Sequence, residues 1–159
     1  MTLSIRPVTK DNWRELIKLK VRPDQEHFVA SNLYSIAEAQ FIVDDDDGPG
    51  QWTQYPFGIY DGETPVGFLM YGLNYDSTKM QAFIIRLMVD APLQSKGYGK
   101  FAMEKMIEIF CADQHVQVVG ISYEPENESA RQLYAKYGFI ETGEIVAGEV
   151  LALLKLRLT

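Results

Sequence analysis

The sequence predicts an α/β (α+β) fold, in which a mixed, mostly antiparallel sheet of about seven strands is flanked by about four helices. Apolar runs that end at Gly, Pro or Asp mark the strands, and stretches with apolar residues every three or four positions mark the helices. The predicted order is β-α-α-β-β-β-α-β-α-β-β, with hairpins in the middle and a single β-α-β crossover after them. We expect one domain, residues 1–159.

The N-terminal half supplies two helices and a hairpin. "LSIRPV" alternates as a short strand, and "TKDNWRELIKLK" begins a helix that Asp11 or Asn12 caps. A second helix follows in "SIAEAQFIV". Gly and Pro make residues 44–51, "DDDDGPGQ", a loop. "FGIYDGETPVGFLMYGLNY" then reads as two strands joined by a turn at Asp61 and Gly62.

The C-terminal half has the stronger pattern. "MQAFIIRLMVD" predicts a buried strand and "GKFAMEKMIEIFCAD" a helix with one apolar face. We expect Cys111 on this helix to be a buried thiol. "VQVVGISYE" is the next strand, and "NESARQLYAKYGF" is a helix that Asn127 caps and Gly138 ends. "FIETGEI" and "EVLALLKLRL" complete the sheet.

Charge narrows the range of partners. The net charge is −7, and residues 23–78 contain ten acidic residues but neither Lys nor Arg. That tract would repel nucleic acid and attract a small polycation or a basic peptide, unless it is simply a solvated acidic face. The chain has no apolar stretch of membrane-spanning length and no apolar leader, so we expect a cytoplasmic protein. With His27 and His115 as its two histidines, no metal site is expected.

The stretch "QSKGYGKFAMEKM", residues 94–106, places two glycines ahead of a helix. A Walker A loop would need Ser or Thr where Phe101 follows Lys100. The stretch from Gly97 to Ala102 fits a dinucleotide fingerprint, with Glu124 near the expected acidic position. However, residues 90–96 intervene between strand and glycines, and too little chain remains for further βαβ units.

A third interpretation is a pyrophosphate-binding arch at a helix N-terminus. Backbone N–H groups of residues 95–100 would converge on the phosphates, and the helix dipole would reinforce them. Gly97 and Gly99 permit close approach of the ligand, and Lys96 and Lys100 add positive charge.

This loop resembles the Gln/Arg-x-x-Gly-x-Gly/Ala loop of the GNAT superfamily, the acyl-CoA-dependent N-acyltransferases. "PENESARQLYAKYGF" is similar to a second family segment, with Asn127, Ala130, Tyr134, Gly138 and Phe139 in the matching positions. The resemblance extends over essentially the whole chain. Within the superfamily, "YDGETPVGFLMYG" and "GEIVAGEVLALLKL" resemble bacterial polyamine acetyltransferases of the spermidine and spermine type.

The resemblance implies acetyl-CoA as the co-substrate. It would place pantetheine along Leu87, Met88 and Val89, with the thioester where this strand separates from "VQVVGISY", and a backbone N–H of Met88 or Val89 as oxyanion donor. Tyr134 would be the general acid for the thiolate. The implied cofactor-binding residues are Leu87, Met88, Val89, Gln94, Ser95, Lys96, Gly97, Tyr98, Gly99, Lys100, Asn127 and Tyr134.

The acceptor site is less defined. Asp24 and Glu26, between the first two helices, are expected to bind ammonium groups, together with Glu149. Some polyamine acetyltransferases carry a carboxylate base on the central strand, where this chain has Ile84, Ile85 and Arg86. A water chain to Glu26, Glu124 or Glu149 is the alternative. Three aromatic residues could line the site as faces for a cation: Tyr34, Trp52 and Tyr75.

Other functions remain compatible with the sequence. The acceptor could be a protein N-terminus or lysine instead of spermidine or spermine, or the chain could bind acyl-CoA without turnover. A homodimer is possible by analogy with the family, with the apolar last strand "VLALLKL" as a sheet edge.

Overall fold

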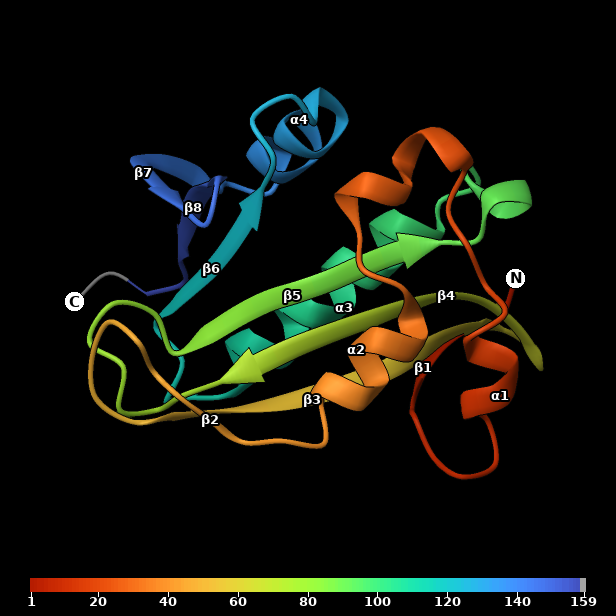
Figure 1. Cartoon of the computed structure of the whole chain (residues 1–159), viewed down its shortest axis with the longest axis horizontal. Coiled ribbons are helices and arrows are strands. Elements are labelled where there is room, and N and C mark those ends of the chain that lie inside the picture. The colour runs from red at the N-terminus through yellow and green to blue at the C-terminus, as the bar shows by residue number, and fades with distance from the viewer. Residues whose placement is uncertain (158–159) are drawn as a thin grey trace.

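The computed structural model of the chain describes residues 1–157 (Figure 1). Along the chain, the elements are β1 (Leu3–Pro7), α1 (Trp13–Leu16), the 3-10 helix η1 (Pro23–Phe28), α2 (Asn32–Glu38), β2 (Val43–Asp44), β3 (Gln51–Asp61), β4 (Thr64–Leu73), β5 (Ala82–Val89), the 3-10 helix η2 (Ala91–Leu93), α3 (Tyr98–Ala112), β6 (Val118–Tyr123), α4 (Glu128–Lys136), β7 (Ile140–Val146) and β8 (Glu149–Lys155).

The strands form one mixed sheet in the order β1-β3-β4-β5-β6-β8-β7, with β2 paired to β3. Among the described strands, β5 and β6 are the parallel pair and the remaining pairs are antiparallel. Helix α3 is the crossover between them, so the predicted mixed α/β fold is confirmed. The single crossover also excludes the repeated parallel units of a dinucleotide-binding sheet.

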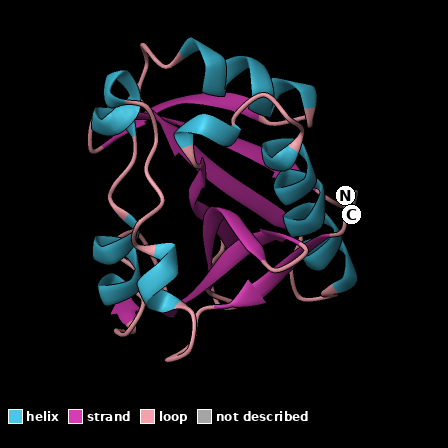
Figure 2. Ribbon diagram, turned by 90° about the vertical axis from the view of Figure 1, so that its right-hand side faces the viewer, coloured by secondary structure: helices cyan, strands magenta, loops and turns pink. Residues whose placement is uncertain are grey.

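Helices cover both faces of the sheet (Figure 2). On one face, α3 contributes Ala102, Met103, Met106 and Phe110 to the larger core, where each is at most 1% exposed. On the other face, a smaller core of Phe68, Met70 and Met88 is covered by residues of α2 and of the segments around α1 and η1. This arrangement holds β5 in the middle of the molecule, packed on both sides.

Helix α4 begins and ends as the sequence predicts. The side chain of Asn127 accepts a hydrogen bond from the Ala130 N–H at the start of α4. Gly138, just beyond the end of α4, has φ 94°, which favours glycine. These two signals fix both ends of α4, the helix that follows β6.

The segment after β1 differs from the prediction. Helix α1 has only four residues, and Asn12 does not cap it, because its side chain instead bonds the Thr9 N–H and the Pro7 carbonyl. The chain leaves the helix because the Lys20 N–H donates to Asp90 Oδ1, and the Lys20 carbonyl accepts from the Ala91 N–H. The predicted second helix begins earlier than expected, with Ser31 as its N-cap.

Further corrections concern β2, β3 and β8. Residues Val43–Asp44 pair with Gln51–Trp52, so the acidic loop is the turn of a short hairpin. Strand β3 therefore starts at Gln51, ahead of the predicted strand, which began at Phe57. The last strand, β8, lies between β6 and β7, so it is not an edge as expected; β7 is.

Cys111 is exposed, contrary to the expected buried thiol. It follows Phe110, which is 1% exposed, and the helical turn carries the next side chain away from the sheet. The lone cysteine therefore belongs to the solvent side of α3.

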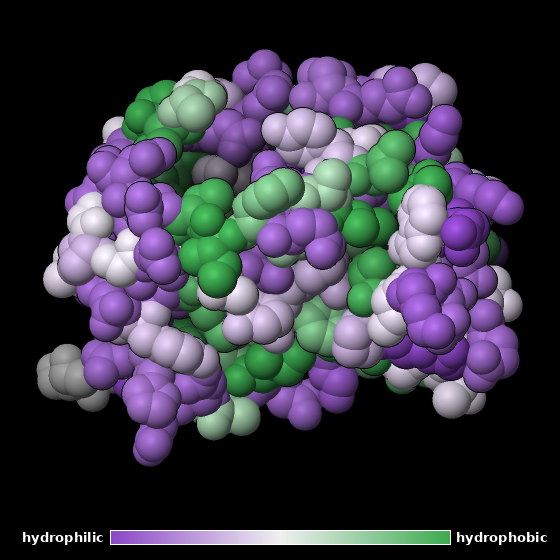
Figure 3. All heavy atoms as spheres, turned by 60° about the horizontal axis from the view of Figure 1, so that its bottom comes forward, coloured by the Kyte–Doolittle hydropathy of each residue, from purple (hydrophilic) through white to green (hydrophobic). Residues whose placement is uncertain are grey.

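The surface is mainly hydrophilic, with apolar areas in the middle of the face shown in Figure 3. Exposed apolar residues after α2 include Phe41, Ile42 and the first residue of β2, Val43. Within residues 1–157, no helix combines the length and the apolar character needed to cross a membrane.

Candidate active site

A large cavity opens where β5 and β6 separate. The two strands pair only from Ala82–Val119 to Ile84–Ile121. Beyond that point β5 stays paired to β4 as far as Val89, and β6 stays paired to β8 as far as Tyr123. The facing edges of both strands are thus left with unpaired backbone groups, which is costly unless water or a ligand binds them. The cavity measures about 1020 Å³.

The glycine loop closes one end of this cavity. Ser95 has φ 63° and Gly97 φ 92°, so the backbone turns back on itself before α3. Gln94 holds the loop to both neighbours: its Nε2 donates to the Val89 carbonyl (3.1 Å) and to Gln25 Oε1 on η1 (2.9 Å). Because its N-cap is Gly97, α3 has no side-chain cap, and its first N–H groups are left for another partner.

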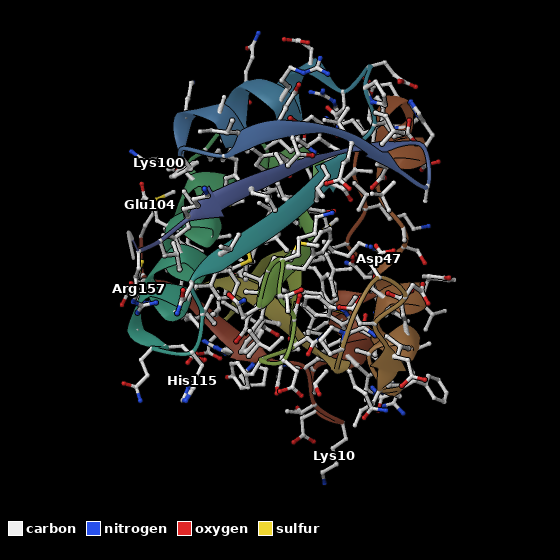
Figure 4. The ribbon with its side chains drawn as sticks, turned by 90° about the vertical axis from the view of Figure 1, so that its left-hand side faces the viewer. Lys10, Asp47, Lys100, Glu104, His115 and Arg157 are labelled. Atoms are coloured by element: carbon white, nitrogen blue, oxygen red, sulfur yellow. The ribbon has the colours of Figure 1, made fainter. Side chains whose placement is uncertain are left out.

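Gly99, in the first turn of α3, also lines the cavity. A Cβ added there would meet only Val89 Cγ2, at 3.9 Å. The protein itself therefore leaves space above this turn, as the close approach of a phosphate group to backbone N–H groups requires. Lys100 lines the same end of the cavity, 4.0 Å from Glu104 on the next turn (Figure 4).

Tyr134 projects from α4 into the cavity. Its ring lies 5.6 Å from the ring of Tyr123 on β6 and 6.2 Å from Phe139. Among residues 1–157 its hydroxyl has no hydrogen-bond partner. Burial, followed by the charges of Tyr123 and Glu149, raises the pKa of Tyr134 to about 12. The phenol is therefore protonated at neutral pH and can donate to a group in the cavity.

Two side-chain networks surround Tyr134. Ser122 Oγ donates to Glu149 Oε1 over 2.6 Å, joining β6 to β8 within the cavity wall. Tyr123 Oη donates to Glu141 Oε1 (2.8 Å), which also accepts from Arg131 Nε (2.7 Å). The first network offers a carboxylate to the cavity, and the second holds the ring against which Tyr134 packs.

Helix η1 and the following residues form the opposite wall. Asp24 lies 3.4 Å from Arg22, so its charge is partly compensated. Glu26 lines the same wall, and among the described residues no cation lies within 4.0 Å of its carboxylate. Arg86 of β5 adds a cation: its Nη2 is 3.7 Å from Glu38, and its Nε is buried without a hydrogen-bond partner in residues 1–157.

The cavity brings together most residues that the sequence suggested. Those that line it are Asp24, Glu26, Leu87, Val89, Gln94, Ser95, Gly97, Gly99, Lys100, Asn127, Tyr134 and Glu149.

Three residues expected at the cofactor do not bring their side chains to the cavity. Met88 packs into the smaller core with Phe68 and Met70. Tyr98 is 6% exposed and its hydroxyl donates to Asp61 Oδ2, 2.8 Å away. Lys96 is exposed outside the lining. These three could contribute only backbone groups, or, for Lys96, long-range charge.

The remaining candidates are dispersed. Glu124 is absent from the cavity lining, whereas His27 lies on it beside Phe28. Among the three aromatic candidates, Tyr34 is exposed and Tyr75 donates to Asp113, while Trp52 lines a smaller pocket. Sequence reasoning missed Ser122, Tyr123 and Gln25, because ordinary polar residues on a strand and a turn carry no motif.

Two features build this site: a glycine loop ahead of α3 and a cavity between two diverging parallel strands. Residues 10–139 match the family model described as "Acetyltransferase (GNAT) family". The chain therefore belongs to the GNAT family of acetyltransferases, and it is an acetyl-CoA-dependent N-acetyltransferase.

Individual relatives of the chain are also named as acetyltransferases. The chain is 27% identical over 150 residues to a spermine/spermidine N(1)-acetyltransferase of Bacillus subtilis (strain 168), covering 91% of this chain and 92% of the relative. Solved structures include an acetyltransferase from Thermus thermophilus, with a TM-score of 0.72 at 17% identity, covering 98% of this chain and 97% of that one. A spermidine N-acetyltransferase from Vibrio cholerae in complex with CoA and spermine has a TM-score of 0.71 at 15% identity, covering 98% and 96%.

Proposed function

We propose that this enzyme acetylates a primary amine of a small polycation, of the spermidine or spermine type, by direct attack of the amine on acetyl-CoA. The observation that carries the proposal is the free hydroxyl of Tyr134 inside the cavity where β5 and β6 part. Residues 1–159 would act as one catalytic domain.

Acetyl-CoA fits the features of this cavity. Its pyrophosphate would bind the backbone N–H groups of the loop from Gln94 to Lys100, in the open space beside Gly99, which has no side chain. Its pantetheine would extend along the unpaired edge of β5 at Leu87 and Val89, as an added strand does. The acetyl thioester would then lie near the point of divergence, at the Ile84–Ile121 pair.

Tyr134 would donate to the sulfur as the carbon–sulfur bond breaks. A thiol has a reference pKa of about 8.5, so a phenol with a pKa of about 12 is the weaker acid. Tyr134 would therefore keep its proton and stabilise the developing thiolate through a hydrogen bond, while the proton that leaves the newly acylated nitrogen goes to the thiolate or to water. A backbone N–H of Met88 or Val89 would stabilise the oxyanion.

The acceptor amine must lose a proton before it attacks, since a Lys-like amine has a pKa of about 10.4. Glu149 is the best-placed carboxylate for this path among the three candidates, because it lines the cavity with Ser122 beside it. Glu26, on the opposite wall, would bind a second ammonium group. Glu124, absent from the cavity lining, is the weakest of the three.

Polycationic acceptors are supported by charge and by relatives. The net charge of −7 attracts cations to the enzyme. A relative that aligns over most of the chain is named for spermine and spermidine. The same negative net charge would also attract a basic peptide.

One observation favours that second acceptor class. The guanidinium of Arg86, whose Nη2 lies 3.7 Å from Glu38, belongs to a residue of the cavity wall. A peptide carbonyl could accept a hydrogen bond from this guanidinium, whereas a polyamine has no such group. Protein or peptide amines are therefore the alternative acceptors.

A turnover assay that follows the release of free thiol tests both acceptor classes, polyamines and peptide amines. Spermidine, spermine, a simple diamine and a lysine-rich peptide would be compared at equal concentration. Saturable turnover with the polyamines and little with the peptide supports the proposal. Turnover with the peptide alone would replace it by the second acceptor class, and acetyl-CoA binding without turnover of any amine would point to a non-catalytic acyl-CoA-binding module.

A further inference from the structure

Arg86 places a cation on the wall of the catalytic cavity, in the middle of the molecule. The pairing of β5 with β4 shifts by one residue at Ile85, and such a bulge changes the direction of the side chains beside it. Ile84 packs into the larger core with residues of α3. Arg86 instead lies near Glu38 of α2, on the opposite face of the sheet. The bulge therefore allows a charged side chain on a central strand to face the cavity.

Within residues 1–157, most N–H donors of this guanidinium have no acceptor. Nη1 donates to the Ile85 carbonyl over 3.0 Å. Nη2 lies 3.7 Å from Glu38 Oε1, near enough for an ion pair but too far for a direct hydrogen bond. Nε is buried without a partner, so only the Nη atoms could meet a ligand. Two Nη atoms side by side suit a carboxylate, which can accept two parallel hydrogen bonds.

The charges that line the cavity are balanced, unlike those of the whole chain. The Asp, Glu, Arg and Lys residues of its lining are Asp24, Glu26, Glu149, Arg22, Arg86 and Lys100, and the acidic residues 44–47 are not among them. Arg22 lies 3.4 Å from Asp24, and Lys100 belongs to the glycine loop. Two carboxylates and the guanidinium of Arg86 remain. These charges suit an acceptor that carries both an ammonium and an anionic group.

The space next to Arg86 is apolar. Met88 faces α2 as Arg86 does, and it lines a second pocket of about 260 Å³. Strands rise about 3.3 Å per residue, so the two positions are about 7 Å apart along β5, which is within the reach of one amino acid. The residues that this pocket shares with the catalytic cavity are Val21, Glu26, Val29 and Ala30. An apolar group could therefore extend from the cavity into this pocket.

We propose that the enzyme also acetylates the α-amine of a small amino acid with an apolar side chain, whose carboxylate binds the Nη atoms of Arg86. This activity goes beyond the proposed polyamine acceptors. The nitrogen bonds to the acetyl carbon, the carbon–sulfur bond breaks, and CoA leaves as the thiol. The ammonium loses two protons in all, one to the thiolate and one to water. The side chain of the amino acid would enter the pocket beside Met88.

The test compares three acceptors that differ only in one group on the carbon next to the amine. L-Leucine carries a carboxylate there, L-leucinamide a neutral amide, and 3-methylbutylamine a hydrogen. We expect the wild type to acetylate leucine and to use leucinamide less well. Arg86→Gln should lower the preference for leucine over 3-methylbutylamine, as a ratio of kcat/KM values, by about 10- to 100-fold, because a charge-assisted hydrogen bond is lost. Arg86→Lys keeps the charge without the two parallel donors and should give an intermediate ratio.

A second variant should change the preference in the opposite direction. Glu38 competes for the guanidinium, so Glu38→Gln should lower KM for leucine by about 2- to 5-fold, the range for loss of a partly exposed ion pair. If the ion pair were only structural, both variants would weaken every acceptor alike, which would overturn the inference. Arg14→Gln, at an exposed position outside the cavity lining, is the matched control and should keep the wild-type ratio.

The outcomes separate this inference from the proposed function. If the wild type acetylates spermidine, but leucine is not acetylated or keeps its preference in Arg86→Gln, the inference is wrong and the polyamine acceptor stands. If leucine is acetylated with a preference that depends on Arg86, and no polyamine is, the inference stands and the polyamine acceptor is wrong. Equal kcat/KM for leucine and leucinamide would indicate recognition of a carbonyl and would overturn the inference.

Discussion

Ser122 Oγ donates a 2.6 Å hydrogen bond to the carboxylate of Glu149, and the pair lines the same cavity as Tyr134. The bond joins two neighbouring strands, β6 and β8, at the end where β6 has already left β5. Glu149 is thus held at a fixed place opposite η1, where an incoming amine would have to shed its proton.

Glu149→Gln should lower kcat/KM for the acceptor by about 10²-fold, because an amide cannot take a proton from the amine. The amide oxygen can still accept from Ser122, so the fold should persist. Initial rates would be measured from neutral to alkaline pH. We expect the loss of kcat/KM to become smaller at high pH, because the amine is already neutral there. A loss of kcat/KM that does not depend on pH would contradict this role of Glu149. Glu126→Gln is the control.

Tyr134→Phe should reduce kcat by about 10²-fold and leave acetyl-CoA affinity unchanged, because the ring is kept and only the donor is lost. Tyr137→Phe on the following turn, outside the cavity lining, is the matched control. Steady-state kinetics and calorimetric titration with acetyl-CoA separate the two effects. Unchanged turnover in the Tyr134→Phe enzyme would remove Tyr134 from the chemistry.

Gly97 and Gly99 should respond differently to alanine. Gly97 has φ 92°, so Gly97→Ala should lower the free energy of unfolding by about 1–2 kcal/mol. Gly99→Ala meets only Val89 Cγ2, at 3.9 Å, so stability should be retained while acetyl-CoA affinity falls, because the methyl group occupies the ligand's space. Urea unfolding and acetyl-CoA titration would be compared. Full affinity in Gly99→Ala would argue against phosphate binding at this turn.

Glu141 should contribute to stability in a pH-dependent manner. Hydrogen bonds from Arg131, and then from Tyr123, hold the pKa of Glu141 below its ordinary value. A lowered folded-state pKa stabilises the fold above the unfolded-state pKa, and this contribution is lost as pH falls through the folded-state value. Glu141→Gln should therefore be less stable than wild type near neutral pH, and the difference should disappear in acid.

Urea unfolding of both proteins at several pH values measures this difference. Because Glu141 is exposed, high salt should also reduce it. A difference that persists unchanged in acid would contradict the ion-pair origin.

Local patterns predicted the C-terminal half well. The apolar spacing of α3, the Asn127 cap and the Gly138 stop depend on residues within one or two turns of one another. Such signals are present in the sequence itself, as are the two motifs that carry the family resemblance. The GNAT fold and the glycine loop before α3 therefore followed from the chain alone.

Contacts between residues far apart in the sequence decided the features that local patterns did not predict. Helix α1 ends early because Asp90, seventy positions away, takes the Lys20 N–H. β8 is interior because β7 folds back over it, and sequence order does not fix the order of strands in a sheet. Met88 and Tyr98 turn their side chains into the cores although they belong to the segments expected at the cofactor.

By itself, the sequence determined the class of enzyme, since a glycine loop ahead of a helix and a capped helix need only neighbouring residues. The tertiary structure decided which carboxylates share the cavity with Tyr134. Glu149 and Glu26 lie far apart along the chain, and only the separation of β5 from β6, with η1 packed across the gap, brings them to one cavity. The chemistry of an acceptor site depends on such convergence, because charge and shape act through space and not along the chain.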